Sequence, residues 1–221
     1  MEARPRIDRD SRREAILDVA AEVFMDVGYS AASMSAIAAR VGGSKGTLYN
    51  YFRSKEELFS AYIERYCARH QELMDEIVSQ GSDARTVLAG LGGAQLRIVT
   101  SEAGLRNFSL IVSEAGRAPE IGRAFYRSGP TRGIARLAHF IERAIADGQL
   151  RPCDPDAAAH QFVGLCQHRL FKACLCNSGP DLTDAEMDAE VEAAVDTFMA
   201  AFGRPETRPQ DRRSSSPVIP T

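Results

Sequence analysis

The sequence predicts an all-α fold in which an N-terminal helix-turn-helix unit precedes a larger helical body. Apolar residues recur at helical spacing along most of the chain, and no run of four to eight residues alternates as a half-buried strand would. Serine, threonine or aspartate begins many of these segments, and glycine or proline ends them. Hydrophobic residues make up 44% of the 221 residues, which is enough to fill a packed core.

Three short helices are expected over 11–27, 33–41 and 44–51. The first starts at a capping box formed by Ser11 and Glu14, whose side chains satisfy free backbone donors of the first turn. Glycines follow the first two helices. Three short helices joined by such turns indicate a helix-turn-helix.

The body is expected to contain seven further helices, over 54–80, 87–98, 105–115, 119–128, 134–147, 154–178 and 183–202. Asp154 caps the sixth of these, with Pro155 at its first helical position. Thr183 and Glu186 form a capping box at the start of the last helix. The pair Gly129–Pro130 is expected to break the chain between the fourth and fifth helices.

Charge is unevenly distributed along the chain. The net charge is −3 and the pI is about 5.9, so the chain is not a polycation that coats nucleic acid. Residues 1–55 hold nine Lys or Arg against seven Asp or Glu, whereas residues 66–202 hold 13 against 18. This asymmetry favours a protein that docks on nucleic acid with its N-terminal end alone.

The composition favours a reducing cytoplasm as the compartment. The first residues are charged, and no stretch approaches the ~18 consecutive apolar residues of a membrane span. The five cysteines are an odd number without the spacing of a disulfide framework. Cys174 and Cys176 are expected to be free thiols, because side chains two residues apart on a helix point about 200° apart.

One segment carries most of the functional signal. Residues 33–58 read SMSAIAARVGGSKGTLYNYFRSKEEL, with a hydroxyl cap, a turn glycine, the run 44–49, Phe52 and the pair Ser54–Lys55 at fixed spacing. At these positions the chain resembles the DNA-binding signature of the TetR (tetracycline-repressor-like) family. The stretch 110–150 resembles the ligand-binding half of the AefR-like subgroup. The resemblance implies a homodimeric DNA-binding regulator released from operator DNA by a small molecule.

The predicted third helix has the two faces that a recognition helix needs. Leu48 and Phe52 lie four residues apart and form an apolar back, whereas Lys45, Thr47 and Asn50 point outward toward base edges. The residues expected to contact double-stranded operator DNA are Ser33, Ser44, Lys45, Gly46, Thr47, Tyr49, Asn50, Tyr51 and Lys55.

Two of these residues are assigned to the DNA backbone. Tyr49 lies on the flank of the helix, where its hydroxyl reaches a phosphate. Lys55 lies at the start of the next helix, where its charge and the free backbone N–H groups both favour a phosphate. Gly46 removes a side chain where the helix approaches closely. Taken singly, Lys45 and Lys55 would read as solvated surface lysines, and only the whole pattern favours the DNA-binding interpretation.

The sequence departs from the family pattern at Gly43, where the family usually has valine. This change removes a small core contact and adds backbone freedom. The turn is therefore expected to be looser, or the recognition helix differently pitched.

The helical body is expected to bind an effector and to dimerise. A small apolar or aromatic effector is expected, and the candidate pocket residues are Phe108, Val112, Phe125, Phe162, Cys166 and Arg169. The helices over 156–176 and 183–202 are expected to pair with those of a second copy, because a continuous apolar stripe needs a partner surface. The candidate interface residues are Phe162, Leu165, Val191, Val195, Phe198 and Phe202.

These assignments divide the chain into a flexible arm over 1–10, a helix-turn-helix domain over 11–54, an effector-binding and dimerisation domain over 55–203 and a disordered tail over 204–221. Enzyme signatures such as His-Glu-x-x-His, Gly-x-Ser-x-Gly and the P-loop do not occur in the sequence. No catalytic residue, metal ligand or cofactor is therefore assigned, and no membrane partner is expected. The alternative function is an effector-independent repressor or an activator with the same mode of DNA binding.

Overall fold

The computed structural model describes residues 9–81, 83–178 and 182–204, and these residues contain helices but no strand. In chain order the elements are α1 (Arg9–Ala31), α2 (Met34–Val41), α3 (Lys45–Tyr49), α4 (Lys55–Gln80), α5 (Ala84–Thr100), α6 (Glu102–Ala115), α7 (Pro119–Tyr126), η1 (Arg127–Thr131), α8 (Arg132–Ala146), α9 (Pro155–Gln167), α10 (Leu170–Leu175) and α11 (Asp184–Phe202). The prediction of an all-α fold is confirmed. The expected arm and tail fall almost entirely outside the described residues.

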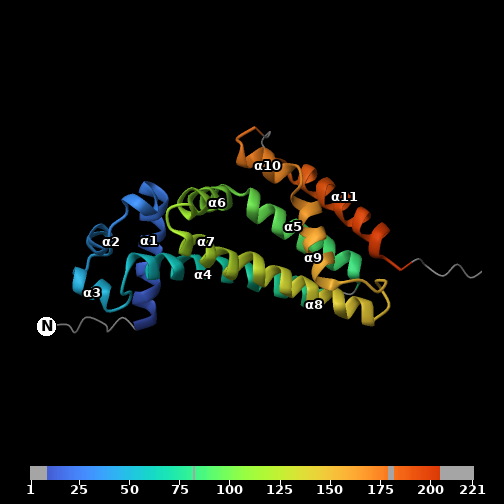
Figure 1. Cartoon of the computed structure of the whole chain (residues 1–221), viewed down its shortest axis with the longest axis horizontal. Helices are drawn as coiled ribbons and strands as arrows, with labels where there is room; N and C mark the ends of the chain where they lie inside the picture. The colour runs from blue at the N-terminus through green and yellow to red at the C-terminus, as the bar shows by residue number, and fades with distance from the viewer. Residues whose placement is uncertain (1–8, 82, 179–181, 205–221) are drawn as a thin grey trace, which may run out of the picture.

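The molecule is elongated, with α1, α2 and α3 at one end and α9 and α11 toward the other (Figure 1). The 26-residue α4 spans about 39 Å at 1.5 Å per residue and runs along the length of the fold. Ser54 caps it by accepting a hydrogen bond from the N–H of Glu57. This helix therefore connects the helix-turn-helix to the body.

The first helix differs from the prediction at its start. It begins at Arg9, so Ser11 lies inside the helix and forms no cap. Gly28, with φ of 79°, interrupts the helical backbone where the sequence predicted the end, and one more helical turn follows to Ala31. Glycine adopts this left-handed conformation without the clash of a Cβ.

Two hydrophobic cores lie along the molecule. The first contains buried residues of α1, α2 and α3, the first half of α4 as far as Cys67, and Ile111 and Ile121 from α6 and α7. The second is formed by α5, α8, α9 and α11. The first core therefore extends past residue 54, and α6 and α7 are packed into the same core as the helix-turn-helix.

The apolar stripe of α11 is buried inside the chain, which corrects the predicted dimer interface. Phe162, Val191, Val195 and Phe198 are each at most 4% exposed and form part of the second core. Leu165 and Phe202 are half-buried beside them. The sequence prediction assigned this stripe to a second copy. Periodicity shows that one face of a helix is buried, but it does not show which element covers that face. In this fold α5 and α9 cover it.

The expected break at Gly129–Pro130 does not occur. The chain continues from α7 through the π-helical turn η1 into α8, with Pro130 inside the turn. A π-turn accommodates the proline by changing the local hydrogen-bond pattern. The carbonyl oxygen of Ser128 instead accepts a hydrogen bond of 2.6 Å from the Gln71 side chain of α4.

The predicted helix over 154–178 is divided into α9 and α10 by a bend at Arg169, whose φ and ψ are −115° and −67°. The Arg169 guanidinium donates two hydrogen bonds, of 2.9 and 2.6 Å, to the buried carboxylate of Glu190 on α11. Asp154 caps α9 as predicted, and Thr183 and Glu186 form the predicted capping box of α11. The thiols of Cys174 and Cys176 are free, as expected.

Candidate DNA-binding surface and ligand cavity

The helix-turn-helix is closed by hydrogen bonds at each helix end. Ser33 and Ser44 cap α2 and α3 by accepting from the N–H groups of Ala36 and Thr47, both at 3.1 Å. At the end of α2 the N–H groups of Gly42 and Gly43 donate to Ala39 and Ala38, which is the Schellman pattern. The sequence therefore encodes this turn locally, through residues that favour caps and through a glycine with φ of 72°.

The recognition helix α3 presents the face that the sequence predicted. Leu48 and Phe52 are 2% and 1% exposed and form its apolar back. Among the predicted DNA contacts, Ser33, Ser44, Lys45, Gly46, Tyr49 and Asn50 are exposed, and Thr47 and Tyr51 are half-buried. The Thr47 hydroxyl lies 2.9 Å from that of Ser44, and the Lys45 ammonium lies 5.8 Å from the centre of the Tyr49 ring.

The structure gives Lys55 a different role from the predicted phosphate contact. Its ammonium donates to the carbonyl oxygens of Tyr29 at 2.8 Å, Ser30 at 3.3 Å and Ala32 at 2.9 Å, and it lies 4.4 Å from the centre of the Tyr29 ring. A lysine ammonium has three donors, and these carbonyls occupy all three. Lys55 therefore holds the end of α1 against the start of α4.

Other arginines surround the turn. Arg53, just before α4, is exposed and pairs with no carboxylate among the described residues. Arg40 is bound to α1 through Glu22 at 3.1 Å and Asp26 at 3.0 Å. A Cβ added to Gly43 would lie 3.2 Å from a guanidinium nitrogen of Arg12, so the missing side chain leaves space for this arginine. Sequence reasoning did not select Arg53, since an isolated arginine carries no motif.

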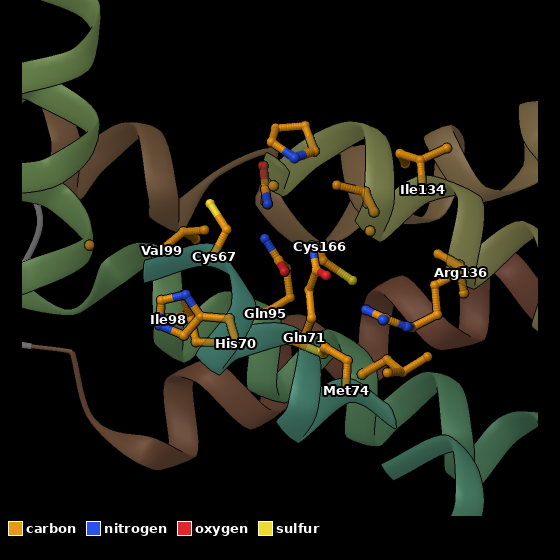
Figure 2. Close-up of a pocket in the computed structure, with 18 of the residues that line it drawn as sticks. Cys67, His70, Gln71, Met74, Gln95, Ile98, Val99, Ile134, Arg136 and Cys166 are labelled. Carbon is orange, nitrogen blue, oxygen red and sulfur yellow. The ribbon is translucent and has the colours of Figure 1, made fainter. Parts of the chain in front are cut away.

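A cavity of about 390 Å³ lies in the body of the molecule. Side chains of α4, α5, α8 and α9 surround it, among them Gln71, Gln95, Ile134 and Cys166 (Figure 2). Its volume lies within the range of about 300–1,000 Å³ that is typical of small-molecule sites. The lining is mainly apolar and includes a cluster of aromatic rings, in which Phe108 lies 6.3 Å from Phe125 and 5.3 Å from Phe171 between ring centres.

The structure brings four of the six predicted pocket residues to this cavity, namely Phe108, Phe125, Phe162 and Cys166. Two others lie elsewhere. Val112 is 58% exposed, because it projects from the outer face of α6. Arg169 is paired with Glu190 and does not line the cavity. The cavity arginine is instead Arg136 of α8, which a helical pattern alone does not distinguish from its exposed neighbours.

Burial favours the neutral forms of three titratable groups of the cavity, namely His70, Cys67 and Cys166. Burial, with a smaller contribution from Arg69, lowers the pKa of His70. Burial also raises the pKa of the Cys67 thiol to about 11 and that of Cys166 to about 12. Uncharged cysteine behaves as a small apolar residue, so these thiols add to the apolar wall and are poor nucleophiles.

Helix α6 joins the cavity to the helix-turn-helix. Asn107 and Phe108 line the cavity, and the side-chain oxygen Oδ1 of Asn107 accepts a hydrogen bond from the Tyr62 hydroxyl of α4. Two turns further along, the buried carboxylate of Glu114 accepts from both the N–H and the hydroxyl of Ser30. Ser30 lies three residues before the cap of α2, so one rigid helix contacts both the ligand cavity and the DNA-binding unit.

No group of three or more His, Cys, Asp or Glu is arranged to hold a metal ion within 9–81, 83–178 and 182–204. No helix in this part of the chain is both long and apolar enough to cross a membrane. The described residues combine an exposed recognition helix with a mainly apolar cavity. Together with the capped turn, these features define a helix-turn-helix DNA-binding regulator with a helical body.

Comparison with known proteins identifies the family. Residues 16–62 match the model of the tetR family of bacterial regulatory proteins, and residues 86–204 match that of the AefR-like transcriptional repressor C-terminal domain. The chain belongs to the TetR family of transcriptional regulators, which confirms the resemblance predicted from residues 33–58 and 110–150. Members of this family bind DNA and dimerise.

Curated relatives are transcriptional regulators as well. The chain is 51% identical over 61 residues to the HTH-type transcriptional activator FasR of Mycolicibacterium smegmatis, a match that spans 28% of each chain. It is 26% identical over 161 residues to the HTH-type regulator YhgD of Bacillus subtilis, covering 70% of this chain and 80% of that one. The FasR match thus covers only about a quarter of that protein's length.

Solved structures share the fold over nearly the whole chain. A TetR-family regulator from Mesorhizobium loti has a TM-score of 0.81 at 25% identity, covering 89% of this chain and all of that one. The flavonoid-responsive regulator FrrA has a TM-score of 0.76 at 32% identity, covering 89% of this chain and 99% of that one.

Proposed function

We propose that this regulator is a ligand-released repressor that binds a palindromic operator as a homodimer. The observation that carries the proposal is the mainly apolar cavity of about 390 Å³, connected through α6 to the helix-turn-helix. A body built only to dimerise would have no need of a cavity on this scale. As a bacterial regulator of this kind, it would act in the cytoplasm and without catalytic activity.

The DNA contacts follow from the exposed face of α3. Lys45, Thr47 and Asn50 would read base edges, and Tyr49 would bind a phosphate. Arg53 takes the phosphate role first assigned to Lys55, because its charge is exposed and the Lys55 ammonium is saturated by carbonyls. Residues 11–54 remain the proposed DNA-binding domain, and residues 55–203 the proposed effector and dimerisation domain.

The dimer would form through the outer faces of α9 and α11. On α11 the exposed Ala185, Ala189 and Ala193 recur every four residues, opposite the buried stripe, and form an alanine face. Small side chains allow two helices to approach closely. Gly164 and the half-buried Leu165 extend the same kind of surface on α9. An isologous twofold contact between these faces would direct the two α3 helices to one side, as a palindromic operator requires.

Release would proceed through α6. A ligand that displaces Phe108 or Asn107 moves the helix that holds Ser30 through Glu114. A shift of α6 therefore changes the position of α2 and α3 relative to the body. In a dimer this changes the separation of the two recognition helices, which must match successive major grooves about 34–36 Å apart or a multiple of that distance.

The effector is proposed to be apolar or aromatic. The rings of Phe108, Phe125 and Phe171 offer edges and faces to a planar ligand. The flavonoid-responsive regulator FrrA is similar to 89% of this chain. Flavonoids are therefore the first compounds to screen.

The test combines operator selection with ligand linkage. Purified protein first selects its operator from genomic fragments, and ligand affinity is then measured with and without saturating operator. A ligand that weakens the affinity of the protein for operator must itself bind more weakly to the protein–operator complex than to the free protein. The two affinities fall by the same factor, typically about 5–150-fold. If the ligand binds equally well with and without operator, it does not regulate DNA binding, and the protein is a constitutive regulator. The FasR match, to a protein named as an activator, favours activation as the second candidate, and transcription with and without the chain decides between the two.

A further inference from the structure

The cavity contains one permanent positive charge. Arg136 extends from α8 into the cavity toward Gln71 and Met74 of α4 (Figure 2). Its Nε forms an ion pair with Asp75, with 2.5 Å between the nitrogen and a carboxylate oxygen, but its Nη1 is buried and has no hydrogen-bond partner among the described residues. An arginine remains charged at all physiological pH values, so this donor cannot be neutralised by losing a proton.

The Arg136 side chain is 27% exposed, but its Nη1 has lost contact with water without gaining an acceptor, and a buried donor without an acceptor costs free energy. An occupant that supplies an oxygen would recover that cost. Asp75 compensates only part of the charge, since its own side chain is 60% exposed and bonds to Nε alone. The cavity thus contains an unused site for an acceptor or an anion.

The other polar groups around the cavity do not compete for this role. The described lining residues include no aspartate and no glutamate. The amide of Gln95 also points into this space (Figure 2). His160, at the edge, lies 3.8 Å from Asp156, outside the cavity. The described lining therefore contains no carboxylate that would repel an anion. Arg136 and the Gln95 amide can both bind one.

We propose that the ligand is an apolar or aromatic acid, whose carboxylate, sulfonate or ionised hydroxyl binds Arg136 while its hydrophobic part fills the phenylalanine-lined space. This inference rests on the proposed function of the cavity and specifies its ligand class. A neutral apolar molecule of the same shape would bind the walls but leave the Arg136 donor unsatisfied.

The test uses two fluorescent probes that differ in one group. 1-Anilinonaphthalene-8-sulfonate and N-phenyl-1-naphthylamine share their rings, and only the first carries an anion. The full chain without DNA should bind the sulfonate more tightly, at one site per chain. Arg136→Met keeps the aliphatic length and should weaken sulfonate binding about tenfold or more, with the neutral probe unchanged. Arg143→Met, on an exposed position of the same helix, is the matched control and should change neither affinity.

A second variant tests the same site by changing Asp75, the ion-pair partner of Arg136. Asp75→Asn removes the competing carboxylate and should tighten sulfonate binding several-fold without affecting the neutral probe. Unchanged sulfonate affinity in Arg136→Met would overturn the proposal, and so would equal losses for both probes together with no gain in Asp75→Asn. Binding of neither probe to the unaltered chain would count against the cavity itself. If the sulfonate binds more tightly than the neutral probe but does not change operator affinity, ligand release is rejected and the proposed role of Arg136 is retained.

Discussion

At the scale of single residues, the two glycines of the turn have different conformational requirements. Gly42 has φ of 72° and ends α2 in the left-handed region, where a Cβ is strained. Gly43 has an ordinary φ, and a Cβ there would lie 3.2 Å from the movable tip of Arg12 and in ordinary contact, at 3.9 Å, with the Cβ of Thr47. The departure of Gly43 from the family pattern therefore leaves the hydrogen-bonded turn in place.

This difference predicts opposite effects for the same substitution. Gly43→Ala should raise the free energy of unfolding by about 0.4–1 kcal/mol, because it restricts the unfolded chain and the Arg12 side chain can move aside. Gly42→Ala should lower it by about 1–2 kcal/mol through left-handed strain. Urea denaturation of the two variants measures both values. A loss of stability in Gly43→Ala as large as that in Gly42→Ala would show that the Arg12 contact is rigid.

Lys55 and Arg53 provide a second residue-scale prediction. Lys55→Met should lower the free energy of unfolding by about 1–3 kcal/mol, because three carbonyl oxygens lose their charged donor. Arg53→Met should leave stability unchanged and reduce the slope of log affinity against log salt by about one. Thermal melts and DNA titrations at several salt concentrations measure the two effects. A reduced salt slope in a fully stable Lys55→Met protein would return the phosphate contact to Lys55.

At the scale of elements, the connection between cavity and DNA-binding unit depends on where two side chains lie along α6. Phe108 and Glu114 are six residues apart, and the first faces the ligand cavity while the second holds Ser30. A helix transmits displacement along its length because its backbone hydrogen bonds resist local bending. In the sequence alone, α6 has the pattern of an ordinary amphipathic helix, and only its contacts show the connection.

Glu114→Ala should therefore separate ligand binding from its effect on DNA. The substitution removes both acceptors of Ser30 and touches no cavity residue, so ligand affinity should be retained while the ligand weakens DNA binding several-fold less. Ser113→Ala, an exposed neighbour on α6, is the control and should behave as the unaltered chain. Operator titrations with and without ligand measure the coupling. Full coupling in Glu114→Ala would assign the transmission to another contact.

At the scale of the whole molecule, the buried stripe of α11 and its alanine face have separate roles. The stripe joins α11 to α5 and α9 within one chain, and the alanine face is the proposed contact with a second copy. Ion pairs reinforce the internal contact, as between Arg97 and Asp188 at 2.6 Å. The proposed dimer contact therefore lies on the side of α11 opposite to the one that the fold buries.

Two substitutions on α11 should distinguish these roles. Ala193→Arg should yield a folded monomer with weakened operator binding, because a long charged side chain blocks close approach of the alanine faces. Val195→Glu should instead lower the melting temperature strongly, since Val195 is 1% exposed and the new carboxylate would be buried without a partner. Light scattering and circular dichroism measure the two outcomes. Ala135→Arg, on the exposed side of α8, should remain dimeric, and a dimeric Ala193→Arg would place the interface elsewhere.

The sequence by itself determined the features that depend on neighbouring residues. The caps at Ser33, Ser44 and Thr183 and the turn at Gly42 were predictable, because each is a bond or backbone angle within about four residues. The all-helical class followed from periodicity, and the family from the spacing of residues 33–58. Four of the six residues predicted for the effector pocket line the cavity, namely Phe108, Phe125, Phe162 and Cys166, and their role in binding an effector stays a prediction.

Only the tertiary structure decided which partner each side chain meets. Periodicity marked Val195 and Phe198 as buried but did not distinguish α5 from a second chain. Lys55 was predicted to bind a DNA phosphate, but its ammonium donates to the carbonyl oxygens of Tyr29, Ser30 and Ala32. Arg169 was predicted to line the effector pocket, but it pairs with the carboxylate of Glu190. These partners are remote in sequence. Arg136 enters the cavity because of how α8 packs against α4 and α9. Long-range contacts depend on how helices are docked, and a local pattern carries no information about that geometry.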